Sequence, residues 1–565
     1  MVICKSHREM FNNSLIVDKF YQFILPNTAK VFAVCISAFV DALIVATLLG
    51  SEAMAIVNLG NPIILTVSTI GALLTVGGST LYASACGAFD KPKADRIFSV
   101  ATYTALAISI LLTLIAYLSR GTIVTWLCAG NLQLIDSSSS YIGILIGSMP
   151  VLTAANVLFG FLPSAGKPKM SSMLMLLANV VNLCLDIFFI KVCGMGIEGA
   201  AYATVCGYGA ALLWYLICYW RKKVNTLLVR ITSHDLLSLK EICSMGASSS
   251  LSQLSFVLKI TLCNSIALHY GGDTGLIAFS VCMQLLSITS IFVGGIGSSM
   301  INITATLRGG RDFLSSQKVV SRAYSLIFIC ALVTLAVFCA FSHQIATIYK
   351  ATEGEVHSMT VQAIRIFSLA IILRSIIVVF MFYVQSIHKT AYASFISLFD
   401  GFVGNLPIAA CCCMLMGING LWWSFPITSV ILTLIILAWN LRLLKKDRSM
   451  SFRNILLIER DADILHEESV TEELTDASGS LILAHEAIKT HGWNDILSSY
   501  LTTLAARKSP VKIDWLIRQF PDRFILDIRS NVNSITEKQI PTPDNIKVTN
   551  EMVLGMNCLR MVSKS

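Results

Sequence analysis

Long apolar runs alternate with short polar segments over most of the chain. Twelve of these runs come near or exceed the ~20 residues that a helix needs to cross a bilayer. They are residues 30–49, 57–83, 98–118, 139–162, 171–192, 199–220, 247–269, 275–304, 321–343, 360–386, 392–415 and 418–441. A segment inside lipid has to satisfy its own backbone hydrogen bonds, so each run predicts an α-helix. The pattern therefore predicts an all-α polytopic membrane protein.

The pattern also repeats. Met195-Gly196-Ile197-Glu198-Gly199 closes the fifth run, and Met416-Gly417-Ile418-Asn419-Gly420 closes the eleventh. This predicts two six-helix pseudo-repeat bundles in the same orientation, as in transporters that rock two bundles around a central site. The expected divisions are a cytoplasmic lead-in at 1–29, an N-terminal bundle at 30–220, a cytoplasmic linker at 221–246 and a C-terminal bundle at 247–445.

Lysine and arginine gather in alternate loops, which by the positive-inside rule are cytoplasmic. The basic loops contain Lys91, Lys93 and Arg96; Lys167 and Lys169; Arg221, Lys222 and Lys223; Arg308, Arg311 and Lys318; Lys389; and Arg442, Lys445 and Lys446. Both termini are therefore expected in the cytoplasm, and the expected location is the plasma membrane. The expected surroundings are the lipid bilayer, and no nucleic-acid partner is predicted.

The composition changes after the last run. Residues 451–565 carry 13 Lys and Arg against 16 Asp and Glu, a net charge of −3. An acidic linker is expected at 446–480, followed by a small cytosolic α/β tail at 481–565 with a helix at 481–506. Two alternating runs at 511–518 and 523–529 predict a β-hairpin, and a last helix is expected at 551–562.

The overall composition agrees with a membrane protein and argues against several kinds of functional site. Hydrophobic residues make up 55% of the chain and charged residues 13%, about half the charged share of a soluble protein. The 17 cysteines include no CxxC pair and lie mostly in apolar runs, which favours small hydrophobes over a disulfide framework or metal site. No GxxxxGK[ST], HExxH or GxSxG motif occurs, so neither an enzyme nor an ATP-driven pump is predicted.

Four polar residues inside the N-terminal runs are the candidate coupling site. At ~1.5 Å per residue, Asp41 and Asn182 lie ~16 Å, and Asp186 and Thr204 ~22 Å, above the cytoplasmic surface. Ionisable groups at this depth are functional hypotheses by default, although a protonated aspartic acid bonded to a neighbouring helix is the alternative. Two carboxyl groups in one apolar site cannot both ionise without a cation, so one of them is expected to hold a proton, and loss of that proton makes room for Na⁺. Asn156 either lines the substrate cavity or bonds a neighbouring helix.

The C-terminal bundle carries different charges, namely Lys259, Arg365, Arg374 and Asp400. Asp400 either pairs with Lys259 or Arg374, or takes part in transport. No carboxylate stands at the repeat position of Asp186, so the two halves are expected to be chemically unequal.

The chain resembles the multidrug and toxic compound extrusion (MATE) transporters over about residues 20–445. The resemblance is carried by Val40-Asp41-Ala42, Gly77-Gly78-Ser79, Ala165-Gly166-Lys167-Pro168-Lys169, Asn182-Leu183-Cys184-Leu185-Asp186 and Gly194 through Thr204, and is greatest to the branch named for the DNA-damage-inducible F protein. It implies a V-shaped pair of bundles that exports organic cations or other amphipathic drugs in exchange for H⁺ or Na⁺. It also implies a cation site at Asp41, Asn182, Asp186 and Thr204, with no other metal site.

The tail resembles the anti-sigma-factor-like histidine-kinase ATPase fold. Ala484-His485-Glu486-Ala487-Ile488 is similar to the first nucleotide helix of that fold, and Gly555 through Val562 to its Gly-Leu-Arg-Met-Ile helix. Thr490 and Ser530 replace the residues that would ligate Mg²⁺ and read adenine, which argues against ATP binding. A degenerate domain that binds a cytosolic protein partner is expected instead.

The sequence thus predicts a secondary active multidrug efflux antiporter. Two alternatives stay open. A lipid-linked saccharide flippase would need a cationic central cavity, which Lys259, Arg365 and Arg374 permit. A membrane sensor that signals through the tail would need the tail to bind ATP.

Overall fold

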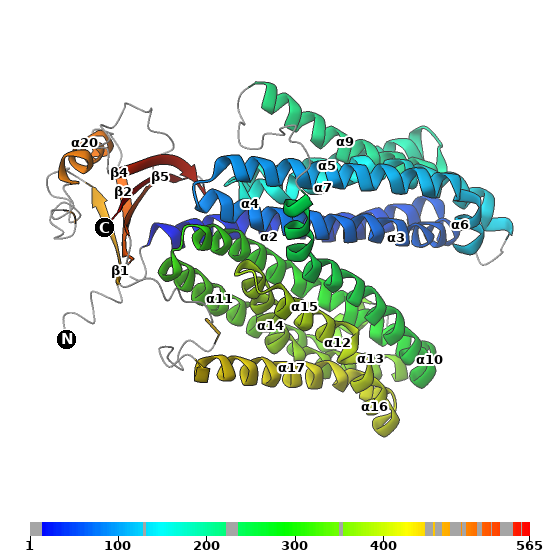
Figure 1. The fold of residues 1–565 in the computed structure, drawn as a ribbon. Helices are drawn as coiled ribbons and strands as arrows, with labels where there is room; N and C mark the ends of the chain where they lie inside the picture. The colour runs from blue at the N-terminus through cyan, green and yellow to red at the C-terminus, as the bar shows by residue number, and fades with distance from the viewer. Residues whose placement is uncertain are drawn as a thin grey trace.

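The structure is a computed structural model of the chain (Figure 1). It describes residues 14–127, 132–221, 236–349, 354–446, 456–457, 466–474, 488, 493–505, 511–520, 523–531, 546–554 and 556–564. The predicted cytoplasmic linker at 221–246 and the acidic linker at 446–480 lie largely outside these residues, as does the part of the predicted tail helix before 488.

The first half of the chain forms a helical N-terminal lobe. Its elements are α2 (Leu15–Leu49), α3 (Ser51–Gly71), the π-helical turn η1 (Ala72–Val76), α4 (Gly77–Gly87), α5 (Lys91–Leu118), α6 (Arg120–Leu127), α7 (Leu132–Ser164), α8 (Pro168–Ile187), the π-helical turn η2 (Phe188–Val192) and α9 (Gly196–Trp220). The turn η1 joins α3 to α4 without a break, so these three elements form one span.

The second half forms a helical C-terminal lobe. Its elements are α10 (Leu236–Gly309), α11 (Phe313–Ala340), α12 (Ser342–Ile348), α13 (Gly354–Ser368), α14 (Ala370–Ser386), α15 (Thr390–Leu398), the π-helical turn η3 (Phe399–Val403), α16 (Asn405–Met416) and α17 (Ile418–Lys446). The long α10 contains two spans, because Gly272 leaves helical geometry with φ 57°.

The described residues confirm the predicted helical membrane architecture. Ten helices are long and apolar enough to cross a bilayer, and α13 with α14 forms an eleventh span that bends by 43°. Dividing α10 at Gly272 gives the predicted twelve. The first helix begins at Leu15 rather than at residue 30, because Leu15, Ile16, Phe20 and Phe23 are buried instead of lying in an aqueous lead-in.

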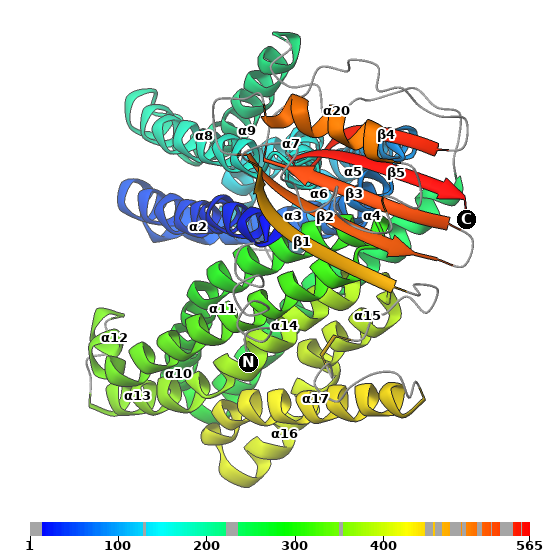
Figure 2. The same cartoon turned by 90° about the vertical axis from the view of Figure 1, so that its left-hand side faces the viewer.

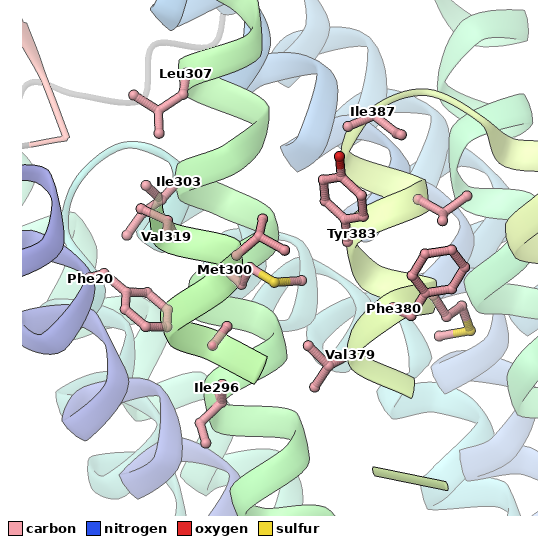
Figure 3. Packing of buried hydrophobic residues seen from close by; sticks show 14 of the residues in the cluster. Phe20, Ile296, Met300, Ile303, Leu307, Val319, Val379, Phe380, Tyr383 and Ile387 are labelled. Atoms are coloured by element: carbon pink, nitrogen blue, oxygen red, sulfur yellow. The ribbon is translucent and has the colours of Figure 1, made fainter. Parts of the chain in front are cut away.

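The buried start of α2 packs against the other lobe. Phe20 of α2 lies beside Ile296, Met300 and Ile303 of α10, and Val379 and Tyr383 of α14 belong to the same apolar cluster (Figure 3). A hydrogen bond of 2.8 Å from Asn27 to Ser299 continues this contact. The N-terminal part of α2 thus ties the two lobes together.

The two lobes form a V. Their helices lie close together beside the C-terminal sheet and diverge away from it (Figure 1); we call these the sheet end and the far end. At the sheet end α4 and α10 cross on two glycines. A Cβ on Gly87 would lie 1.8 Å from the carbonyl oxygen of Thr306, and a Cβ on Gly309 would lie 1.8 Å from that of Ser84. Only glycine therefore permits this approach at either position.

A five-stranded antiparallel sheet forms the C-terminal tail (Figure 2). Its strands are β1 (His466–Leu474), β2 (Val511–Gln519), β3 (Arg523–Ser530), β4 (Ile546–Val553) and β5 (Met556–Lys564), in the spatial order β1-β2-β3-β5-β4. The predicted hairpin is confirmed as β2 and β3. The predicted last helix is wrong, because β4 and β5 occupy 551–562 as a second hairpin. Part of the predicted acidic linker is β1, which pairs with β2.

The two faces of the sheet differ in chemistry because side chains alternate along a strand. One face packs its apolar side chains, including Trp515, Leu526 and Leu559, against α20 (Asn494–Ala505). The opposite face carries the charged side chains Asp514, Arg518, Asp527, Arg529 and Arg560.

The charged face docks on the sheet end of both lobes. Arg518 and Arg560 both donate hydrogen bonds to the carbonyl oxygen of Gly310 in the α10–α11 turn. The guanidinium of Arg529 pairs with Asp312 at 2.7 Å in the same turn. Arg560 also lies over the ring of Phe89, 4.3 Å from its centroid, in the corresponding α4–α5 turn of the N-terminal lobe. The sheet therefore contacts equivalent turns of the two halves.

Candidate functional site

Asp41 lies in the far half of α2, where the apolar run would otherwise face lipid or the space between the lobes. Its carboxylate accepts a hydrogen bond of 3.3 Å from the hydroxyl of Ser37, one helical turn earlier. Residues four apart share a helix face, so the sequence places these two side chains together. Asp41 keeps part of its surface accessible, which leaves it reachable by a small ion.

Asn182 and Asp186 lie one turn apart on α8 and are 4% and 2% exposed. With the amide nitrogen of Asn182 facing α2, it donates to both carboxylate oxygens of Asp41 at 3.2 Å. In the same orientation the amide oxygen accepts from the backbone N–H of Thr204 at 3.2 Å. This orientation satisfies both ends of the amide, so Asn182 links α2 to the first turns of α9.

The two carboxyl groups of the N-terminal lobe are in contact. Asp41 and Asp186 are close enough to share a hydrogen bond, which requires one of them to carry a proton. The oxygen Oδ1 of Asp186 is buried and forms no hydrogen bond with the described residues. A buried oxygen without a donor is an acceptor for a proton or a small cation. The structure thus brings together Asp41, Asn182, Asp186 and Thr204, which sequence reasoning could place only at similar depths.

Three further residues border this group. Ser37 contacts Asp41 directly, Tyr141 of α7 lies near both carboxyl groups, and Tyr208 of α9 lies near Asp41. Helical spacing could have pointed to two of them, because Ser37 precedes Asp41 by four residues and Tyr208 follows Thr204 by four. Nothing in the spacing points to Tyr141. Asn156 is half-buried on α7 and lies against Gly71 of α3 rather than within the carboxyl group cluster.

The C-terminal lobe holds a second cluster of charges around Asp400 in η3. Lys259 donates to the backbone carbonyl of Asp400 at 2.9 Å and lies 3.7 Å from its carboxylate. Arg374 donates to the same carboxylate through Nε at 3.4 Å and through Nη2 at 3.2 Å. Asp400 therefore has both of the partners that the sequence proposed as alternatives. Arg365 lies apart from this cluster and donates to the hydroxyl of Ser342.

A cavity of about 420 Å³ opens beside this cluster, and we call it the C-lobe chamber. It is lined by Ala72, Val76, Ser249, Ser252, Gln253, Phe256, Leu286, Thr289, Ser290, Val293, Gly294, Phe367, Ala370, Ile371, Arg374, Ser375, Ile377, Val378, Met381, Phe382, Ile396, Ser397 and Asp400. Ala72 and Val76 come from η1 of the N-terminal lobe, so the chamber lies where the lobes meet. A cavity of this size suits a drug-sized molecule or a large part of one.

Two curated relatives of the chain are named as export or transport proteins. The multidrug export protein MepA of Staphylococcus haemolyticus (strain JCSC1435) is 22% identical over 431 residues, which cover 74% of this chain and 92% of the relative. The FAD transporter of Shewanella oneidensis is 23% identical over 423 residues, which cover 72% and 90%.

Solved structures share the fold. An outward-facing conformation of a multidrug resistance MATE family transporter of the MOP superfamily superposes with a TM-score of 0.71 at 21% identity, covering 78% of this chain and 98% of that structure. The MatE family model matches residues 26–188 and 249–411, one segment in each lobe and together more than half of the chain. Both segments end before the C-terminal sheet. The chain therefore belongs to the MatE family of membrane transporters, which are not enzymes.

Proposed function

We propose that the protein is a secondary active efflux antiporter that exchanges H⁺ or Na⁺ for amphipathic compounds. The observation that carries this proposal is the contact between Asp41 and Asp186, bridged to Thr204 by Asn182. Two embedded carboxyl groups in contact cannot both be ionised unless a cation lies between them. The pair therefore releases one proton, or takes up one Na⁺, as a single unit. No cofactor is needed for this step.

The geometry supports a cycle in which ion binding changes the balance between two arrangements of the lobes. With the sheet end closed, ions reach Asp41 from the far end. Binding neutralises the group and removes the cost of a buried charge, so the lobes can repack around it. A ligand shifts such an equilibrium only through its different affinity for the two arrangements. Here the difference in affinity arises because ion binding changes the charge that is buried in the N-terminal lobe.

The orientation of the chain belongs to the same proposal. The turns that carry Lys91, Lys93, Arg308, Arg311 and Lys389 all lie at the sheet end. The positive-inside rule places that end in the cytoplasm. The far end, where the V is open, then faces the outside of a plasma membrane. An arrangement closed to the cytoplasm is ready to release cargo and to receive the coupling ion.

The decisive experiment uses the full chain in proteoliposomes. Ethidium and fluorescein are tested as cargo under imposed Na⁺ and pH gradients, which separates the two coupling ions. We expect Asp41→Asn and Asp186→Asn to abolish gradient-driven transport of any dye that the wild type moves. Asp273→Asn, the same chemical change at an exposed aspartate, is the matched control and retains it. Gradient-driven transport at the wild-type rate in either site variant would refute the coupling role.

The tail enters this proposal as a protein-binding domain without nucleotide. The strand β5 stands where the ATPase resemblance implied a helix, and this removes an element that would have contacted ATP. Signalling through tail ATP binding is therefore not favoured, and the branch assignment within the family stays a prediction. Export of a lipid-linked saccharide has one observation in its favour, the cationic cluster of Lys259 and Arg374, whereas Arg365 lies outside it.

A further inference from the structure

The charges around the C-lobe chamber do not balance. Lys259 and Arg374 supply two positive charges, and Asp400 supplies one negative charge to both of them. No other Asp or Glu lines the chamber among the described residues. The cluster therefore carries one uncompensated positive charge. In a site of low polarity an excess charge of this kind favours a counter-ion of opposite sign.

The excess charge is presented to the chamber by the arginine. Lys259 is 1% exposed, and its ammonium is occupied by Asp400 and by the ring of Phe425, 5.6 Å away. The side chain of Arg374 is 16% exposed and lines the chamber. Its Nε and Nη2 bond Asp400, whereas Nη1 forms no hydrogen bond with the described residues. An arginine with donors left over is suited to a carboxylate, phosphate or sulfonate.

The remaining wall suits an amphipathic molecule. Small hydroxyl side chains lie on several sides of the chamber, and apolar side chains such as Phe256, Phe367 and Phe382 cover much of the rest. The hydroxyls can bond neutral polar groups of a cargo, and the aromatic rings can pack against its body. A cationic group would meet Arg374 at close range without a free carboxylate to receive it.

We propose that the C-lobe chamber binds amphipathic organic anions, with the anionic group at Arg374. The inference rests on the proposed function, since it names the class of compound exported. It gives the lobes separate tasks: the carboxyl pair of the N-terminal lobe takes the cation, and Arg374 of the C-terminal lobe takes the cargo. The anionic group belongs either to a soluble compound or to a lipid head group, and the chemistry of recognition is the same.

The test compares two dyes that share a xanthene ring system and differ in charge, anionic fluorescein and cationic pyronin Y. Binding to the purified full chain is followed by fluorescence anisotropy. We expect the wild type to bind fluorescein more tightly. Because a hydrogen bond to a charged group contributes ~1.5–3 kcal/mol, Arg374→Gln should weaken fluorescein binding about 10- to 150-fold and leave pyronin Y unweakened.

Two further variants keep the result interpretable. Arg374→Lys retains the charge without the planar fork of donors and should recover part of the fluorescein affinity, whereas a purely structural role would show no such selectivity between dyes. Arg365→Gln removes an arginine outside the chamber and should bind both dyes as the wild type does. Tighter binding of pyronin Y by the wild type, or equal effects of Arg374→Gln on both dyes, would overturn the proposal.

Transport measurements on the same dyes distinguish failure of the anionic chamber from failure of the proposed antiport. They also show whether the anion is a soluble compound or a lipid. Gradient-driven export of pyronin Y without fluorescein binding would overturn the inference alone. Fluorescein binding without any gradient-driven transport would overturn the antiport function alone. Movement of fluorescein, but not of fluorescently labelled phosphatidylglycerol, assigns a soluble cargo, and the reverse result assigns a lipid; either assignment supports the anionic chamber.

Discussion

Closure of the V at the sheet end depends on the absence of side chains at two positions. An alanine at Gly87 would place its Cβ 1.8 Å from the carbonyl oxygen of Thr306. An ordinary contact of a Cβ atom is 3.4–4 Å, so α4 and α10 must separate by about 1.6 Å or more. The obstacle is backbone, which cannot rotate away as a side chain can. Gly87→Ala should therefore oppose the closed arrangement specifically.

The size of the effect follows from the cost of overpacking. An added methyl group in a well-packed contact costs about 1–3 kcal/mol, which corresponds to a change of about 5- to 150-fold in the ratio of closed to open sheet ends. Gly209→Ala is the matched control, because it adds the same methyl group within helix α9 and meets no atom within 4 Å.

Distances between the far ends of the lobes report the equilibrium. Leu118 at the end of α5 and Leu415 near the end of α16 are 80% and 85% exposed and accept spin labels. The labels are best carried by a genetically encoded amino acid, because the chain contains 17 cysteines. Double electron–electron resonance should show a shorter distance between the two labels in Gly87→Ala, because the far ends approach each other as the sheet end opens. A distance distribution equal to that of the wild type and of Gly209→Ala would refute the reasoning.

Three more predictions follow from the described contacts. Asn182→Leu removes the donor to Asp41 and should raise the concentration of coupling ion needed for half-maximal transport about tenfold or more. An unchanged dependence of transport on Na⁺ and pH would contradict this. Asp312→Ala leaves Arg529 buried without its partner, at a cost of about 3–5 kcal/mol, so trypsin should release the tail faster, whereas Asp90→Ala removes only a helix cap and should not. Burial alone would raise the pKa of Asp527, but Arg560 and Arg518 lower it to about 2. Its contribution to stability is present above the unfolded pKa of ~3.9 and disappears as the pH falls towards 2. Tryptophan fluorescence should therefore report a folded sheet at pH 5 and its loss between about pH 4 and 2.

The membrane helices were predictable because lipid imposes a simple rule on length and polarity. The same rule misjudged the start of α2: Asp18 and Lys19 indicated an aqueous segment, yet Phe20 and Phe23, which follow them in the chain, are buried against the C-terminal lobe. In the tail, Met556–Lys564 carries an apolar residue at most positions, which does not distinguish a helix from a strand covered on both faces. The decisive information lay in what each face meets, α20 on one side and the lobes on the other.

In the candidate site, too, some features were predictable from the sequence and others depend on how the helices pack. Asp41 and Asp186 were recognisable because carboxylates are expensive in lipid, and their depths followed from helical rise. The orientation of the Asn182 amide and the nearness of Tyr141 depend on how α2, α7, α8 and α9 pack, which spacing along one helix does not contain. The charge imbalance at Arg374 depends likewise on three elements meeting, since Lys259, Arg374 and Asp400 lie far apart in the sequence.

A single arginine of the tail touches both lobes. Arg560 donates to the carbonyl of Gly310 at 3.3 Å and covers the ring of Phe89 at 4.3 Å, and these two turns separate in any step that opens the sheet end. Opening therefore forces Arg560 to leave one of them. A protein that captured the released face of the sheet would favour the open arrangement, and cargo that favoured opening would strengthen the capture by the same factor. Transport and tail binding would then be linked in both directions, because the sheet would bind its partner only when the lobes are open at the sheet end.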